Sequence, residues 1–190
     1  MEMQSLQDHF LLAMPSLDDS FFNRSLIYIC EHNDQGAMGL VVNIPVNLSL
    51  KSLLEQVEME QSAAINDSVD MEQIVFQGGP IAQERGFVLH SPKEGFNSSL
   101  SLNKQLMVTT SKDVLQTLGT FDQPEHYIVA LGYSGWEAGQ LEQEIIDNAW
   151  LTLPASADLI FKEPVHKRWE SAAQLLGVDV WQLSSQVGHA

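Results

Sequence analysis

Cysteine, basic residues and long apolar runs are all scarce in this chain of 190 residues. Cys30 is its only cysteine, which excludes an intramolecular disulfide and zinc sites built on several cysteines. The chain has 9 basic residues against 25 acidic ones, and its net charge is -16. Because a field of that sign repels polyanions, we do not expect DNA, RNA or an anionic membrane to bind directly.

No apolar run reaches the roughly 18 residues of a membrane-spanning helix. The apolar stretch 10–15 is too short for a span or an export signal, and the residues before it are acidic where such a signal is basic. Apolar residues still make up 44% of the chain, enough for a folded core. We therefore expect one domain over residues 1–190, without disulfide, metal or cofactor, in the reducing interior of the cytoplasm.

Short strand-like runs alternate with helical patterns along the chain. The runs that favour strands are 9–14, 25–32, 37–44, 73–77, 85–90, 98–102, 106–109, 126–133 and 150–153. The stretches that favour helices are 49–61, 111–118, 137–148, 155–161 and 164–177, with Ser49 and Ser111 at helix starts. Both alternating faces of 25–32 are apolar, which predicts a strand covered on both sides. Antiparallel hairpins with interleaved helices indicate the α+β class.

Several ordered motifs together resemble one family. They are Cys30-Glu31-His32-Asn33, Gly36-Ala37-Met38-Gly39-Leu40-Val41-Val42-Asn43, Gly78-Gly79-Pro80, Arg85-Gly86-Phe87-Val88-Leu89-His90, Ala130-Leu131-Gly132-Tyr133-Ser134-Gly135-Trp136 and Asn148-Ala149-Trp150-Leu151. With them the chain resembles the YqgE/AlgH family of bacterial proteins over nearly its whole length. The resemblance implies an α+β fold in which a bifurcated, largely antiparallel sheet curls into a pseudo-barrel with flanking helices. It also carries the family label of transcriptional regulator, but implies no defined chemistry.

Thiol, acid and imidazole occur together at Cys30-Glu31-His32, and these groups are the usual parts of nucleophilic catalysis. On a regular strand Cys30 and His32 share one face and Glu31 lies on the other, so the three do not converge locally. We expect a buried, unreactive thiol. The alternative is an enzyme or small-anion binder in which Cys30 and His32 meet Arg85 and His90 from another strand.

Ser134 stands between a predicted strand and a predicted helix, where a serine hydrolase places its nucleophile. That motif needs glycine two residues after the serine, and here the position holds Trp136. We therefore expect a tight turn at 132–136, with Ser134 capping the following helix and Trp136 packed on the core. We expect Trp150 and Trp169 in or against the core as well.

One glycine pair and the six histidines are weaker indications of a binding site. Gly78 and Gly79 predict a turn with unusual backbone angles, although beside Arg85 the pair could hold a small anion. No phosphate-loop or dinucleotide-binding motif occurs. The six histidines lack metal-ligand spacing, so a site built from His32, His90 and a remote carboxylate is only an alternative.

Two surface patterns bear on partners. Residues 55–72 carry six acidic side chains and no basic one, which indicates a solvated face or a docking surface for a basic partner. Residues 169–183 approach helix-turn-helix spacing, but the reading helix at 180–189 contains neither lysine nor arginine. We read this segment as a core-packing helix closed by Gly177.

These observations favour a binding or regulatory module over an enzyme. Its partner is then a protein or a small molecule, not nucleic acid. Arg85, Cys30, His32, His90, Gly78, Gly79 and Ser134 are the candidate ligand-binding residues.

The first prediction concerns DNA. Specific DNA binders draw much of their affinity from lysine and arginine contacts to phosphates, and their binding weakens as salt rises. We expect the purified protein to leave labelled duplex fragments free at physiological salt, as measured by fluorescence anisotropy over a salt series. Salt-sensitive, sequence-selective binding in the nanomolar range would contradict this.

Overall fold

The computed structural model describes residues 4–15 and 22–177. Within them lie ten strands and five α-helices. The strands are β1 (His9–Ala13), β2 (Leu26–Asn33), β3 (Gly36–Val41), β4 (Pro45–Ser49), β5 (Ile74–Gln77), β6 (Ile81–His90), β7 (Ser99–Ser101), β8 (Met107–Thr109), β9 (Tyr127–Glu137) and β10 (Trp150–Pro154). The helices are α1 (Leu50–Gln56), α2 (Asp113–Thr117), α3 (Gln140–Ile146), α4 (Ala157–Phe161) and α5 (Arg168–Leu175), with a 3-10 turn at Val165–Lys167 before α5.

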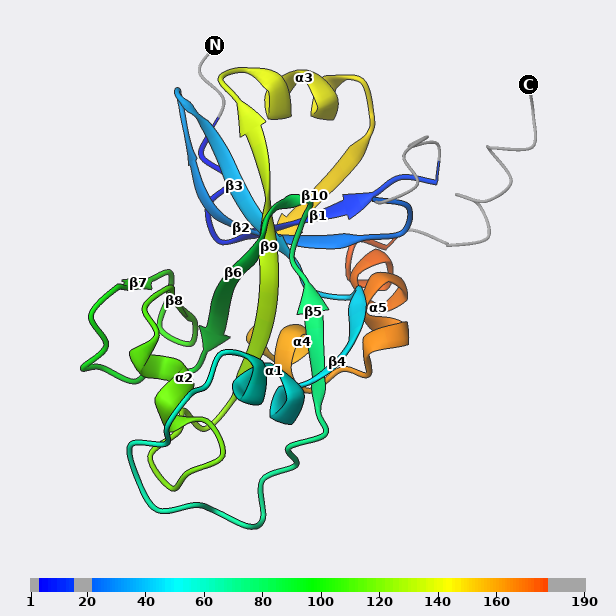
Figure 1. Cartoon of the computed structure of the whole chain (residues 1–190). Coiled ribbons are helices and arrows are strands. Elements are labelled where there is room, and N and C mark those ends of the chain that lie inside the picture. The colour runs from blue at the N-terminus through cyan, green and yellow to red at the C-terminus, as the bar shows by residue number, and fades with distance from the viewer. Residues whose placement is uncertain (1–3, 16–21, 178–190) are drawn as a thin grey trace.

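The ten strands form one sheet with two limbs, and β9 belongs to both. The first limb has the order β10-β1-β2-β3-β9, and the second places β5 and β6 on either side of β9, followed by β4 and by β8 and β7. All pairs are antiparallel except β5 with β9. Figure 1 shows β9 running through the centre of the molecule, with the limbs curling away from it. The α+β prediction, with its bifurcated and curled sheet, is confirmed.

The change of partner along β9 occurs at Gly132. Residues before it pair with β5 and β6, whereas those from Ser134 onward pair with β3. Gly132 has a φ of 74°, a conformation that glycine adopts without steric cost. The strand therefore bends there and passes from one limb to the other. The turn predicted at 132–136, with a helix-capping serine, is wrong because these residues continue β9.

Gly78 and Gly79 pass directly across this bend. Neither has a positive φ, so the prediction of a turn with unusual angles is wrong. Their role is close approach: a Cβ on Gly78 would overlap the carbonyl oxygen of Gly132, and one on Gly79 would overlap the backbone of Tyr133 and Ser134. Hydrogen bonds complete the contact, since Gly78 N–H donates to Leu131 O at 2.8 Å and Gly78 O accepts from Val41 N–H at 2.9 Å.

Three apolar clusters follow from the two-limbed sheet. Inside the curl, both limbs bury side chains against α4 and α5, including Trp169, Ala172 and Ala173. The outer face of the first limb packs on α3, and that of the second limb on α1 and α2. Alternate residues of β2 enter different clusters, with Tyr28 in the inner one and Ile27 in the α3 one. The prediction that this strand is covered on both faces is confirmed.

Buried tryptophans are predicted at 136, 150 and 169, and the structure confirms all three. The rings of Trp136 and Trp150 pack edge to face with centroids 6.2 Å apart. Both indole N–H groups donate to one carboxylate oxygen of Glu144, at 3.2 and 3.0 Å. Trp136 therefore ties β9 to α3 from within a strand and does not close a turn.

Some predicted boundaries were wrong for local reasons. The first helix does begin after Ser49, whose hydroxyl accepts from Ser52 N–H, but it ends at Gln56, before Glu58 takes a left-handed φ of 53°. Ser111 does not cap α2, since its hydroxyl donates to Asp113 instead. The third helix begins at Gln140 because residue 137 still belongs to β9. Strand β4 was not predicted, because Pro45 suggests a break although an edge strand tolerates it.

The structure describes the acidic segment 55–72 completely and the helix-turn-helix-like segment 169–183 in part. All six acidic side chains of 55–72 are exposed. Helix α5 is followed by Gly177 with a φ of 73° and buries Trp169 and two alanines, as a core-packing helix does. The segment 180–189 lies outside the described residues. Among the helices of the described part, none has the length and apolar character needed to cross a bilayer.

The second prediction tests the close approach of Gly79 to the backbone of β9 beside the bend at Gly132. Gly79→Ala should destabilise the protein by about 3 kcal/mol, because the new methyl group meets backbone atoms that cannot rotate away. Gly86→Ala is the matched control, since no other part of the chain comes within 4 Å of the place its methyl group would take and its φ is not positive. Urea unfolding should show a change within about 0.5 kcal/mol for the control. Equal stabilities of the two variants would contradict the close-approach argument.

Candidate functional site

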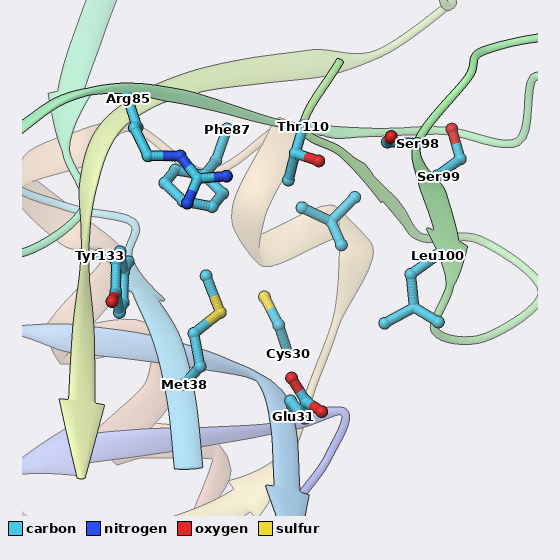
Figure 2. Close-up of a pocket in the computed structure, with 11 residues that line it drawn as sticks. Cys30, Glu31, Met38, Arg85, Phe87, Ser98, Ser99, Leu100, Thr110 and Tyr133 are labelled. Carbon is cyan, nitrogen blue, oxygen red and sulfur yellow. The ribbon is translucent and has the colours of Figure 1, made fainter. Parts of the chain in front are cut away.

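A cleft of about 510 Å³ opens between the two limbs of the sheet. Strands β2 and β3 form one wall, and β6, β7, β8 and the bend of β9 form the other. Its lining residues are Cys30, Glu31, Met38, Arg85, Phe87, Ser98, Ser99, Leu100, Val108, Thr110 and Tyr133. Figure 2 shows the side chains of Cys30, Met38 and Arg85 directed into this space. The cleft therefore has an apolar floor with polar groups around it.

A bulge in β2 determines which side chains reach the cleft. Ile29 pairs with Gly39 and Glu31 with Met38, so Cys30 is the extra residue. The alternation of faces shifts there: Cys30 and Glu31 both line the cleft, and His32 points to the opposite face, toward α3. The prediction that Cys30 and His32 share a face is wrong, because a regular strand was assumed.

Cys30 lies at the floor of the cleft with 2% of its surface exposed. Its Sγ donates weakly to the backbone oxygen of Tyr28 at 3.9 Å. Burial, followed by the negative charge of Glu31, raises the pKa of the thiol well above its ordinary value. Since thiolate is the reactive form, Cys30 serves here as a small apolar group.

Arg85 reaches the cleft from a wide bulge in β6. Ile81 pairs with Tyr133 and Gly86 with Leu131, so residues 82–85 leave the ladder. The guanidinium lies over the ring of Phe87, with Cζ 5.5 Å from the centroid. Within the described part of the chain, no carboxylate lies within ion-pair distance of it. Arg85 is exposed and lines the cleft without an ion-pair partner among the described residues.

His32 and His90 do not line the cleft. His32 Nδ1 accepts from Leu6 N–H at 2.8 Å and its Nε2–H donates to Glu142 at 2.5 Å, which joins the N-terminal segment to α3. Burial opposes ionisation of Glu142, but the hydrogen bond from His32, the backbone N–H of Glu142 itself and the charge of His32 together outweigh it and hold the pKa of Glu142 below its ordinary value. His90 is fully buried behind β8, 2.6 Å from Thr109 Oγ1, and burial lowers its pKa.

Ser134, Gly78 and Gly79 form the limb junction, not the cleft. Ser134 is 1% exposed, and its hydroxyl donates to Gly78 O at 3.1 Å. A serine in this position has no access to a substrate. Of the candidate residues, the structure brings only Cys30 and Arg85 together.

Several lining residues escaped the sequence reasoning. Met38, Phe87 and Tyr133 resemble ordinary core residues, and only the divergence of the limbs leaves them beside a cleft. Ser99 belongs to a polar hairpin that carries no motif. The one sequence signal for the cleft was Glu31, a carboxylate that directly follows the apolar run 26–30 of β2.

Other features around the site are less specific. A second hollow of about 320 Å³ lies on the opposite face of β6, shares Arg85 and Thr110 with the cleft and includes Lys112. No group of three or more His, Cys, Asp or Glu in residues 4–15 and 22–177 is arranged to hold a metal ion.

Comparisons with known proteins match this chain from end to end. A family model described as AlgH-like matches residues 10–181. A UPF0301 protein of Photobacterium profundum is 50% identical over 186 residues, which cover 98% of this chain and 100% of the relative. A UPF0301 protein of Pseudoalteromonas translucida is 53% identical over 190 residues, with 99% and 100% coverage.

Two solved structures share the architecture. The solution structure of the AlgH protein from Pseudomonas aeruginosa superimposes with a TM-score of 0.78 at 42% identity, over 100% of both chains. A crystal structure of a protein from Corynebacterium diphtheriae gives a TM-score of 0.69 over 92% of this chain and 90% of that one. At 18% identity the second match shows a shared fold alone.

The third prediction concerns the thiol. At neutral pH, iodoacetamide should modify Cys30 in the native protein at least about tenfold more slowly than in the urea-unfolded chain. Glu31→Gln removes the nearby negative charge, so it should lower the thiol pKa and raise the labelling rate modestly, with burial still limiting it. Mass spectrometry over time gives both rates. Rapid labelling of the native protein would contradict the buried-thiol assignment.

Proposed function

This chain belongs to the AlgH-like family, and we propose that it acts as a binding module which takes a small ligand with a carboxylate and an apolar body in the cleft between its limbs. Arg85 binds the carboxylate, and the apolar floor receives the rest. The regulatory effect implied by the family label then passes through this ligand or through a protein partner, without direct contact to DNA.

The observation that carries the proposal is Arg85 over Phe87 at the cleft. A guanidinium forms two parallel hydrogen bonds to a carboxylate, and its planarity makes this geometry specific. The guanidinium lies over the Phe87 ring, with Cζ 5.5 Å from the centroid, and Arg85 lines the cleft. An apolar surface beside the charge, including Met38 and Tyr133, favours a ligand that is not purely ionic.

Binding fits this site better than catalysis. The thiol in the cleft is held neutral, and Ser134 is buried in the junction. His32 and His90, the two histidines considered as bases, are occupied by hydrogen bonds away from the cleft floor. Nucleophilic catalysis needs a nucleophile and a base within reach of one another, and the described residues of the cleft offer no such pair.

The fourth prediction is a ligand-dependent rise in melting temperature. A carboxylate with an apolar body, such as 3-phenylpropanoate or 4-methylpentanoate, should stabilise the protein by about 2.7 kcal/mol at a hundred times its Kd. For a chain of this size that corresponds to roughly 5–10 °C in Tm. Differential scanning fluorimetry over a concentration series measures the shift.

Arg85→Gln should abolish this shift. Lys112→Gln is the matched control, because it removes the same charge from the neighbouring hollow and not from the cleft. An unchanged shift in Arg85→Gln, or the absence of any shift with all carboxylates of the panel, would refute the proposed function.

A further inference from the structure

The hydrogen atoms around His90 can be assigned from its partners. His90 Nδ1 lies 2.8 Å from the backbone oxygen of Ser91, and a carbonyl oxygen only accepts, so Nδ1 carries the hydrogen. Complete burial of the ring keeps it in its neutral form. Nε2 therefore presents a lone pair. Its neighbour at 2.6 Å, Thr109 Oγ1, must donate to it.

This assignment fixes the hydroxyl of Ser99 as well. Ser99 Oγ lies 2.6 Å from Thr109 Oγ1. Thr109 has given its single hydrogen to His90, so it can only accept from Ser99. The hydrogen of Ser99 is thus committed to Thr109. Ser99 pairs with Thr109 and Leu100 pairs with Val108, so the Ser99 hydroxyl lies on the face of the β7–β8 hairpin opposite to Leu100 and Val108, whose side chains line the cleft. The Ser99 hydroxyl therefore offers no acceptor to the cleft.

Glu31 provides the acceptor on the cleft. Its carboxylate is exposed and close enough to Cys30 to raise the pKa of the thiol. Figure 2 shows Arg85 and Glu31 on opposite sides of the cleft, with the sulfur atoms of Cys30 and Met38 between them in this view. The cleft therefore has donors on one side, from Arg85, and an acceptor on the other, from Glu31.

The net charge of the chain bears on the ligand too. At -16, the overall field repels a simple anion approaching Arg85. A ligand with one cationic group beside its carboxylate has no net charge, so the overall field does not repel it. Its cation would in addition satisfy the acceptor that a plain carboxylate leaves unpaired.

We propose that the cleft binds an amino acid or short peptide with an apolar side chain, with its carboxylate on Arg85 and its ammonium group on Glu31. This assignment rests on the proposed function and deepens it. The apolar side chain packs on Met38, Phe87 and Tyr133. Free amino acids and short peptides share this chemistry and differ in the separation of their two charges.

A matched series of ligands tests the assignment by isothermal titration calorimetry on the full chain. Leucine carries both charges, 4-methylpentanoate is leucine without its ammonium group, and 3-methylbutylamine is leucine without its carboxylate. Dileucine represents short peptides in the series. We expect leucine or dileucine to bind at least about tenfold tighter than either single-charge analogue, as for a charge-assisted hydrogen bond.

Variants then separate the two ends of the site. Glu31→Gln should weaken the better of the two zwitterions about tenfold without weakening 4-methylpentanoate. Glu84→Gln is the matched control, since Glu84 neighbours Arg85 but does not line the cleft. Thermal melts of each variant confirm that it is folded.

Each outcome is decisive. Equal affinity for the zwitterions and 4-methylpentanoate would overturn the zwitterion assignment and leave the proposed function intact. Binding of none of the four ligands would overturn both. Tighter binding of leucine identifies amino acids as the source, and tighter binding of dileucine identifies peptides.

Discussion

The backbone contact between Gly78-Gly79 and the bend of β9 at Gly132 is the constraint on which the rest of the structure depends. Three residues without side chains allow two main-chain segments to lie against one another where the sheet changes partners. Gly78 then binds Leu131, Val41 and Ser134 at once, so β3, β5 and β9 meet at one residue. Any Cβ at this crossing would force the limbs apart.

The cleft is a consequence of that divergence. Strands that pair in one sheet leave no space between them, but the two limbs separate as they leave the crossing. Two bulges place polar groups at the opening: the one in β2 turns Glu31 toward it, and the one in β6 extends Arg85 from the ladder. Both charged groups therefore owe their position to irregular pairing and not to strand alternation.

Most residues that resembled catalytic groups are bound within the fold. Ser134 holds the crossing, His32 connects the N-terminal segment to α3, and His90 orients Thr109 and through it Ser99. Buried polar side chains need such partners, because leaving one without a hydrogen bond costs roughly 1–3 kcal/mol. Their presence in suggestive motifs reflects this structural requirement.

The sequence by itself determined the α+β class, the double-sided burial of β2, the three buried tryptophans and the position of Cys30 in the core, because apolar periodicity and composition record burial directly. It did not determine which polar groups meet. A one-residue bulge reverses every later side chain of a strand, and the bend at Gly132 replaces a turn by a continuous strand. Both depend on pairing between segments far apart in the chain, so only the tertiary structure decided that Arg85 and Glu31 share a cleft while His32 and Ser134 do not.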